Sequence, residues 1–165
     1  MATRQLSVQR LTVTSSKPFE TVVAALEGAV GHPNMADLQK AIGEAKTYGE
    51  MEGVIQKGLG RTGLMEFMRF DMGAVLRKGH GLDGPKSVRF LIGNPLIMRE
   101  MAKHIPDACS YAPVTILIDE RADGVNLSYD KMASFLAPYD SPETLKVAED
   151  LDSKIEKLLR EAASQ

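Results

Sequence analysis

The sequence predicts a single α+β domain, spanning residues 1–165, built on a mostly antiparallel sheet. A length of 165 residues favours one domain with a sizeable core. Strand and helix patterns follow the order strand, helices, strand, strand, helix, strand, strand, helix, which is not a regular β–α repeat. Two alternating apolar runs within residues 114–129 are joined by a short turn, so they must pair antiparallel. A doubly wound parallel sheet is therefore not expected.

The first 30 residues predict a strand followed by a helix. Apolar residues alternate in part over Leu6–Thr14, as in a half-buried strand. The stretch Ser15–Pro18 predicts a helix start, since serine can cap a helix and proline fits its first turn. Apolar residues then recur at helical spacing from Phe19 to Val30.

Residues 34–60 predict two short helices. Asn34 can cap the first, and Thr47 with Glu50 matches a capping box at the start of the second. Gly58 or Gly60 is expected to close the second helix in a left-handed conformation. Several interior glycines weaken both helices, so we expect them to depend on the rest of the fold.

The middle of the chain predicts two strands and a helix. Leu64–Met72 is the second expected strand, whereas residues 73–84 are ambiguous and end in a glycine-rich loop. Within residues 86–101, alternation in a third strand gives way to helical spacing at Gly93-Asn94-Pro95. We expect this helix to stop at Pro106.

The hairpin at residues 114–129 is the clearest local pattern, because Asp123-Gly124 stands between two alternating runs. Ser141 and Pro142 then predict the start of the last helix. Its expected apolar stripe consists of Leu145, Ala148, Leu151, Ile155, Leu158 and Leu159.

Composition narrows the function classes. The net charge is −2, which argues against a nucleic-acid binder with its usual basic face. The single cysteine, Cys109, excludes an intrachain disulfide framework and a cysteine-rich metal cluster. We find no signal peptide and no apolar window of about 20 residues, so we expect no membrane span. A cytoplasmic protein is the expectation.

The best candidate ligand site combines Gly93 and Asn94 with Asp71, Arg77 and Lys78. A helix start exposes N–H groups that suit a phosphate or carboxylate, so a small anionic metabolite is the expected ligand. The alternative is that Asn94 only caps its helix and that Asp71 is only an ion-paired or surface acid. No nucleotide-binding glycine motif accompanies the site.

Other chemistry has weaker support. His32, His80 and His104 lack metal-ligand spacing, and we expect no metal and no cofactor. Cys109 could be a nucleophile only beside a cationic group. The alternative function is therefore an enzyme or a haem or metal-binding protein that uses His80, His104 or Cys109. The nine methionines suggest core filling, with a dimer interface or an apolar pocket as the alternative.

Four stretches carry a resemblance: Phe67–Gly73, Arg89–Met98, Ala112–Glu120 and Gly124–Asp130. Together they resemble the domain of unknown function 302 family over roughly Leu6–Leu159. The resemblance implies a compact α+β fold with helices on one face of the sheet, similar to a single repeat of the TATA-binding-protein fold. It also implies a homodimer, no established activity, and residues 34–60 as a helical addition.

The sequence departs from that family at two places. Many members carry a cysteine before Asn-Pro, and some carry another after the proline of the hairpin strand. Gly93 and Val114 occupy those places here, so thiol chemistry proposed for the family would lack both groups. We therefore expect an uncharacterised homodimeric protein that binds a small ligand or acts as an accessory protein.

Overall fold

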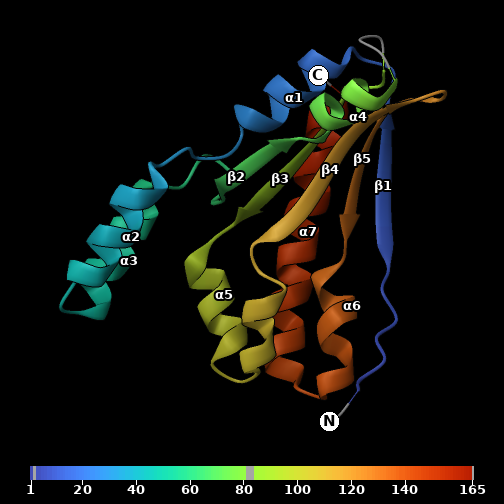
Figure 1. Cartoon of the computed structure of the whole chain (residues 1–165). Helices are drawn as coiled ribbons and strands as arrows, with labels where there is room; N and C mark the ends of the chain where they lie inside the picture. The colour runs from blue at the N-terminus through green and yellow to red at the C-terminus, as the bar shows by residue number, and fades with distance from the viewer. Residues whose placement is uncertain (2, 81–83, 165) are drawn as a thin grey trace.

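A five-stranded antiparallel sheet forms the centre of the protein, as seen in a computed structural model that describes residues 1, 3–80 and 84–164, without the side chain of His80. The strand order is β1-β5-β4-β3-β2 (Figure 1). The strands are β1 (Arg10–Ser15), β2 (Met65–Asp71), β3 (Ser87–Gly93), β4 (Val114–Arg121) and β5 (Gly124–Asp130).

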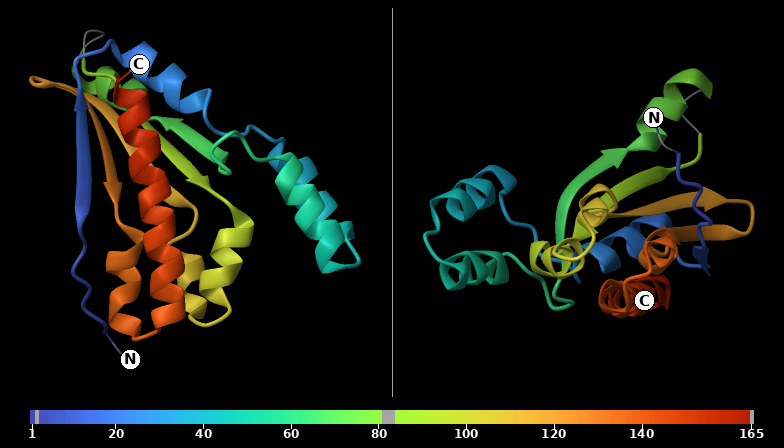
Figure 2. Two further views of the ribbon diagram at one scale, coloured as in Figure 1. Left: turned by 180° about the vertical axis from the view of Figure 1, so that it is seen from behind. Right: turned by 90° about the horizontal axis from the view of Figure 1, so that it is seen from below.

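The helices lie mainly on one face of the sheet, as the α+β prediction requires. Helices α1 and α7 lie behind the sheet in Figure 1. They lie in front of it in the left view of Figure 2, which shows the molecule from the opposite side. Helices α2 and α3 project from the body as an arm. The bounds are α1 (Phe19–Glu27), α2 (Met35–Glu44), α3 (Tyr48–Lys57), α4 (Met72–His80), α5 (Pro95–Ala102), η1 (Pro106–Ser110), α6 (Met132–Leu136), η2 (Ala137–Tyr139) and α7 (Pro142–Ser164).

The predicted hairpin is confirmed. Arg121 pairs with Gly124, which leaves a two-residue turn between β4 and β5. Gly124 has φ of +129°, and a Cβ at this position would lie 2.5 Å from the carbonyl oxygen of Ser15. Glycine is therefore required both by the backbone conformation and by the neighbouring strand β1.

Strand alternation and the α7 stripe together build the main core. Phe90, Ile116 and Leu127 are fully buried on the face that α1 and α7 cover. Fully buried side chains remove apolar surface from water, which is the main favourable contribution to folding. Helix α7 contributes Ala148, Leu151, Ile155, Leu158, Leu159 and Ala162.

An acid lies on the apolar stripe of α7. Asp152 is 7% exposed, and its Oδ1 accepts hydrogen bonds from the Tyr129 hydroxyl (2.6 Å) and the Met132 backbone N–H (2.7 Å). Its Oδ2 accepts from the Ala133 N–H at 3.1 Å. Since Lys131 at the start of α6 provides no side-chain cap, Asp152 satisfies the free N–H groups of α6 from another helix.

The start of the chain differs from its prediction. β1 begins at Arg10 and not at Leu6, because its partner β5 ends at Asp130. The predicted serine cap of α1 is wrong, since Pro18 is the N-cap residue and forms no side-chain cap. The Ser15 hydroxyl instead donates to the Ala163 carbonyl at 2.6 Å, which ties β1 to the end of α7.

The α2–α3 arm follows its predicted caps. The Asn34 side chain accepts from two N–H groups of α2, and Thr47 Oγ1 accepts from the Glu50 N–H. Glu50 bonds back to the Lys46 N–H at 2.7 Å, one residue before the expected position. Gly58 ends α3 with φ of −86°, so the expected left-handed closure is wrong. A small second core joins the arm to β2 through Leu38, Ile55 and Met65.

The structure defines three further segments. The ambiguous residues after β2 form α4, and Asp71 Oδ1 accepts from the Ala74 N–H at 2.7 Å in its first turn. Helix α5 ends at Ala102, earlier than expected, and η1 begins at Pro106. The cap of α7 is confirmed, because the Thr144 N–H donates to Ser141 Oγ at 3.3 Å.

The face of the sheet opposite α1 and α7 carries no helix layer in the views of Figure 2, and we call it the open face. The strand register places Arg89 beside Phe70 and Leu117, and Leu117 beside Ser128. These four side chains form one row across the open face, because alternate residues of a strand point to opposite faces.

Candidate ligand-binding site

The five residues predicted to bind a ligand do not line one pocket. Gly93 pairs with Met65 at one end of β3, whereas Asp71 pairs with Val88 at the other end. The five residue steps from 88 to 93 span roughly 17 Å at the rise of an antiparallel strand. Gly93 and Asn94 therefore lie far from Asp71 and Arg77, and the expected common site is corrected to two separate places.

Asn94 functions as a helix cap. Its Oδ1 accepts from the Leu96 N–H at 2.8 Å, and its Nδ2 donates to the Gly63 carbonyl at 3.0 Å. Gly93 is buried, and a Cβ there would lie 3.3 Å from Pro113 Cβ. The Asn94 side chain thus meets a free N–H of α5 that an anion would otherwise contact.

Asp71 and Arg77 line a hollow of about 500 Å³ near the start of β3. Asp71 Oδ2 accepts from Arg77 Nη2 at 3.3 Å, and Lys86 is paired with Glu20. The hydrogen bond between Lys86 and Glu20 lowers the pKa of Glu20 and raises that of Lys86. Lys78 is exposed and does not line the hollow. The lining of this hollow thus holds three acids, Glu20, Asp71 and Glu120, and two bases, Arg77 and Lys86. This excess of negative charge does not favour the binding of an anion.

The histidines and the cysteine are dispersed. His104 is exposed beyond the end of α5, and the exposed Cys109 Sγ lies 3.5 Å from Met98 Sδ. His32 contacts the Glu27 carbonyl and Glu66. The His80 side chain lies outside the described residues. Among the side chains that are described, no three of His, Cys, Asp and Glu are grouped to hold a metal ion.

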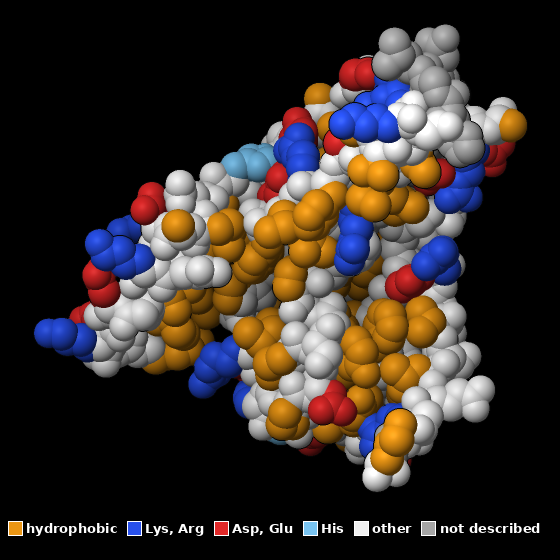
Figure 3. Space-filling view, viewed as in Figure 1, with side chains coloured by type: hydrophobic (Ala, Val, Ile, Leu, Met, Phe, Trp, Pro, Cys, Tyr) orange, Lys and Arg blue, Asp and Glu red, His pale blue; other side chains and the backbone are white. Residues whose placement is uncertain are grey.

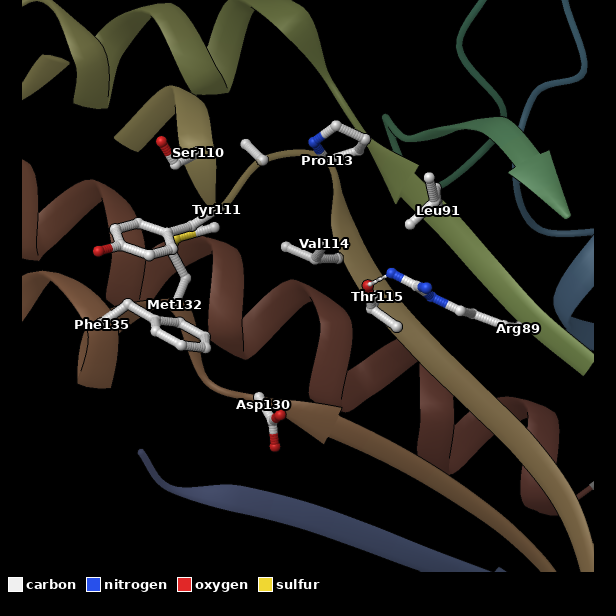
Figure 4. Close-up of a pocket in the computed structure, with 11 residues that line it drawn as sticks. Arg89, Leu91, Ser110, Tyr111, Pro113, Val114, Thr115, Asp130, Met132 and Phe135 are labelled. Carbon is white, nitrogen blue, oxygen red and sulfur yellow. Dashed lines mark hydrogen bonds between the residues drawn. The ribbon is translucent and has the colours of Figure 1, made fainter. Parts of the chain in front are cut away.

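Another hollow, of about 360 Å³, opens on the open face at the start of β4 (Figure 4). We call it the open-face pocket. Residues from β3, β4, α6 and the segment before β4 meet there, although they are far apart in sequence. Its lining residues are Arg89, Leu91, Ser110, Tyr111, Ala112, Pro113, Val114, Thr115, Asp130, Met132 and Phe135.

Arg89 is the distinctive group of the open-face pocket. It is exposed, and its Nη2 donates a long hydrogen bond of 3.4 Å to Thr115 Oγ1. Among the described residues it forms no ion pair with a carboxylate. Asp130 is instead held by Arg10 through two bonds of 2.7 and 2.8 Å, which raise the pKa of Arg10. The pocket and this ion pair together carry one unmatched positive charge.

Aromatic side chains form the other end of the pocket. The rings of Tyr111 and Phe135 stack with centroids 4.9 Å apart and planes 13° apart. The Tyr111 hydroxyl lies 3.1 Å from that of Tyr139, which donates to Asp107 at 2.7 Å. This chain of hydrogen bonds restrains the Tyr111 ring. Figure 4 shows the aromatic pair on the opposite side of Val114 from Arg89.

The sequence alone does not predict this pocket as a whole. Arg89 and Thr115 stand at the polar positions of two alternating strands, which is a signal that they share the open face. No comparable signal links them to Tyr111 or Phe135, which reach the pocket through a turn and a short helix.

None of the helices in the described part of the chain has both the length and the apolar surface needed to cross a bilayer.

Comparison with known proteins identifies the family. The crystal structure of an uncharacterized conserved DUF302 protein from Bacillus stearothermophilus has a similar fold, with a TM-score of 0.65. The two are 11% identical, and the match covers 93% of this chain and 97% of the other. No curated protein matches the chain significantly. The family model "Domain of unknown function DUF302" matches residues 38–162, and the chain therefore belongs to the DUF302 family.

Proposed function

We propose that this protein binds a small anionic molecule in the open-face pocket and acts as a homodimeric, cytoplasmic binding or accessory protein. The observation that carries the proposal is Arg89, an arginine without a carboxylate partner among the described residues, beside a hollow of about 360 Å³. Small-molecule pockets commonly have about 300–1,000 Å³ and a few well-placed polar groups in an apolar lining.

The chemistry of Arg89 suits a carboxylate or a phosphate. Its guanidinium can form two parallel hydrogen bonds to such a group. Thr115 can donate a further hydrogen bond, since its hydroxyl hydrogen is free to rotate. Asp130 does not oppose the anion strongly, because Arg10 neutralises it.

Titration calorimetry with sodium propanoate and with inorganic phosphate tests this proposal. We expect binding to the wild type and loss of at least tenfold in affinity for Arg89→Gln, because the charged donor is removed. Lys78→Gln is the matched control, since it removes an exposed cation outside the pocket and should bind as the wild type does. Equal affinity in Arg89→Gln and wild type would contradict the site.

Five exposed apolar side chains support the homodimer. Met68, Phe70, Met72, Val75 and Leu76 are 40–69% exposed, and we call them the β2–α4 ridge. Figure 3 shows hydrophobic side chains gathered over this part of the open face. A contiguous apolar surface of this kind is typical of an interaction site. A two-fold contact between two copies would cover one ridge with the other.

The cytoplasmic location is supported by Cys109. Its thiol is exposed and unpaired, which suits a compartment that keeps thiols reduced.

A further inference from the structure

We propose that the ligand of the open-face pocket is a monocyclic aromatic acid with a single negative charge, whose carboxylate binds Arg89 and whose ring packs on Tyr111 and Phe135. This inference rests on the proposed function and adds the chemical class of the ligand. It follows from the division of the pocket into a charged end and an aromatic end (Figure 4).

The charged end accepts one anionic group. Arg89 and Thr115 provide its donors and lie 3.4 Å apart. Asp130 also lines the pocket, and its carboxylate already accepts a hydrogen bond from Arg10. Arg89 is the single Lys or Arg among the lining residues. A second carboxylate on the ligand would have no cation of the pocket to pair with, so a monoanion fits better than a dianion.

The middle of the pocket is apolar. Figure 4 shows Val114 between Arg89 and the aromatic pair, and Leu91 on the Arg89 side; with Pro113 they form the apolar part of the lining. Burying a polar linker here would leave its hydrogen bonds unmade. A short hydrocarbon linker between the acid and the ring is therefore expected.

The aromatic end favours a flat ring. Tyr111 and Phe135 already stack nearly parallel, and a third ring can extend such an arrangement by offset or edge contacts. Tyr111 is restrained through Tyr139 and Asp107, so little side-chain freedom is lost when a ring packs on it.

The dimensions limit the length of the ligand. Thr115 and Tyr111 are four residues apart, so their Cα atoms are separated by at most about 14 Å. A phenyl ring joined to a carboxylate by two or three carbons fits such a distance. A long fatty chain does not.

Titration calorimetry with three acids tests the inference: 3-phenylpropanoate, 3-cyclohexylpropanoate and propanoate. We expect 3-phenylpropanoate to bind about tenfold more tightly than its cyclohexyl analogue, and propanoate to bind most weakly. Phe135→Leu should reduce the preference for phenyl over cyclohexyl to less than threefold, because it removes one of the two rings on which the ligand ring packs. Phe67→Leu is the matched control, because Phe67 lines a different hollow with Asn94 and Met98.

The outcomes separate the two proposals. Equal affinity for the phenyl and cyclohexyl acids in the wild type overturns the aromatic class but leaves anion binding at Arg89 in place. Absence of binding by all three acids overturns the aromatic class, and if inorganic phosphate also fails to bind, anion binding at Arg89 is overturned with it. Since Phe135→Leu can alter folding, a nuclear Overhauser measurement on the wild type provides a second test. Contacts between ligand ring protons and the Tyr111 or Phe135 rings are expected, and their absence in a saturated complex overturns the inference.

Discussion

The Tyr129 hydroxyl donates a 2.6 Å hydrogen bond to Asp152, which joins the last residues of β5 to the middle of α7. The same carboxylate accepts two backbone N–H groups at the start of α6. Three elements are therefore held by one buried acid. A carboxylate with three donors is well compensated for its burial, so the cluster stabilises the fold.

Replacing Asp152 by alanine should lower the free energy of unfolding by about 3 kcal/mol, because it leaves a buried hydroxyl and two N–H groups without their acceptor. Urea unfolding followed by circular dichroism measures the change. Asp150→Ala is the matched control, since Asp150 is exposed on the same helix, and it should change stability by less than about 0.5 kcal/mol. A similar result for both variants would contradict the role of Asp152.

Stability should also fall at high pH because of Tyr129. Burial, followed by the charge of Asp152, raises the pKa of Tyr129 well above its ordinary value of 10.0. The unfolded chain loses this proton near pH 10 while the folded protein keeps it. The contribution is therefore complete below pH 10 and declines above it, by up to about 1.4 kcal/mol per pH unit.

Urea unfolding between pH 9 and pH 11 measures this decline. Tyr129→Phe should be less stable than the wild type at pH 9 and should show a shallower fall above pH 10. Parallel curves for the two proteins would exclude Tyr129 as the source.

Gly124→Ala should destabilise the protein by about 1–3 kcal/mol, since the residue has positive φ and its added Cβ meets the Ser15 carbonyl. Gly43→Ala in α2 provides the contrast, because a Cβ there has no atom within 4 Å. It should stabilise the protein by up to about 1 kcal/mol. Thermal unfolding of both variants is the measurement, and opposite signs are the expected result.

Asn94→Ala should cost about 1–2 kcal/mol of stability, since it removes a helix cap and the bond to Gly63. Affinity for propanoate should stay within twofold of the wild type, because Asn94 does not line the open-face pocket. Calorimetry after a stability measurement tests both parts. A loss of binding equal to that of Arg89→Gln would indicate that the ligand binds at the Gly93-Asn94 turn instead.

The wild type should have twice the 18.0 kDa mass of one chain by light scattering at micromolar concentration. Phe70→Ser combined with Val75→Ser should shift it to the monomer mass, because both changes place hydroxyl groups on the β2–α4 ridge. Val8→Ser, at an exposed position outside the ridge, should remain dimeric. A monomeric wild type would refute the homodimer.

Local patterns were enough for much of the fold. The β4–β5 hairpin and the Asn34, Thr47, Asn94 and Ser141 caps depend on residues within a few positions of one another, and each forms as predicted. Met65, Met101 and Met132 fill the core, as the composition suggested. The exposed Met68 and Met72 support the alternative of an interaction surface.

The failures share a physical cause, which is competition from distant partners. Ser15 was expected to cap the following helix, but the Ala163 carbonyl, 148 residues away, takes its hydroxyl. Asp152 interrupts an apolar stripe, and only the fold shows that Tyr129 is its partner. The open-face pocket likewise joins residues from Arg89 to Phe135. Sequence periodicity indicates which face of each helix or strand is buried, but not which elements pack against one another.

The pairing of β1 with β5 has a consequence for synthesis of the chain. Arg10 pairs with Asp130, 120 residues later. At about 5–20 residues per second, a ribosome needs roughly 6–24 s to make the intervening residues. During that interval β1 has no partner strand, whereas β2, β3 and β4 are already made and can pair with one another. The strand that emerges first therefore joins the sheet only after β5, the last strand, has been made.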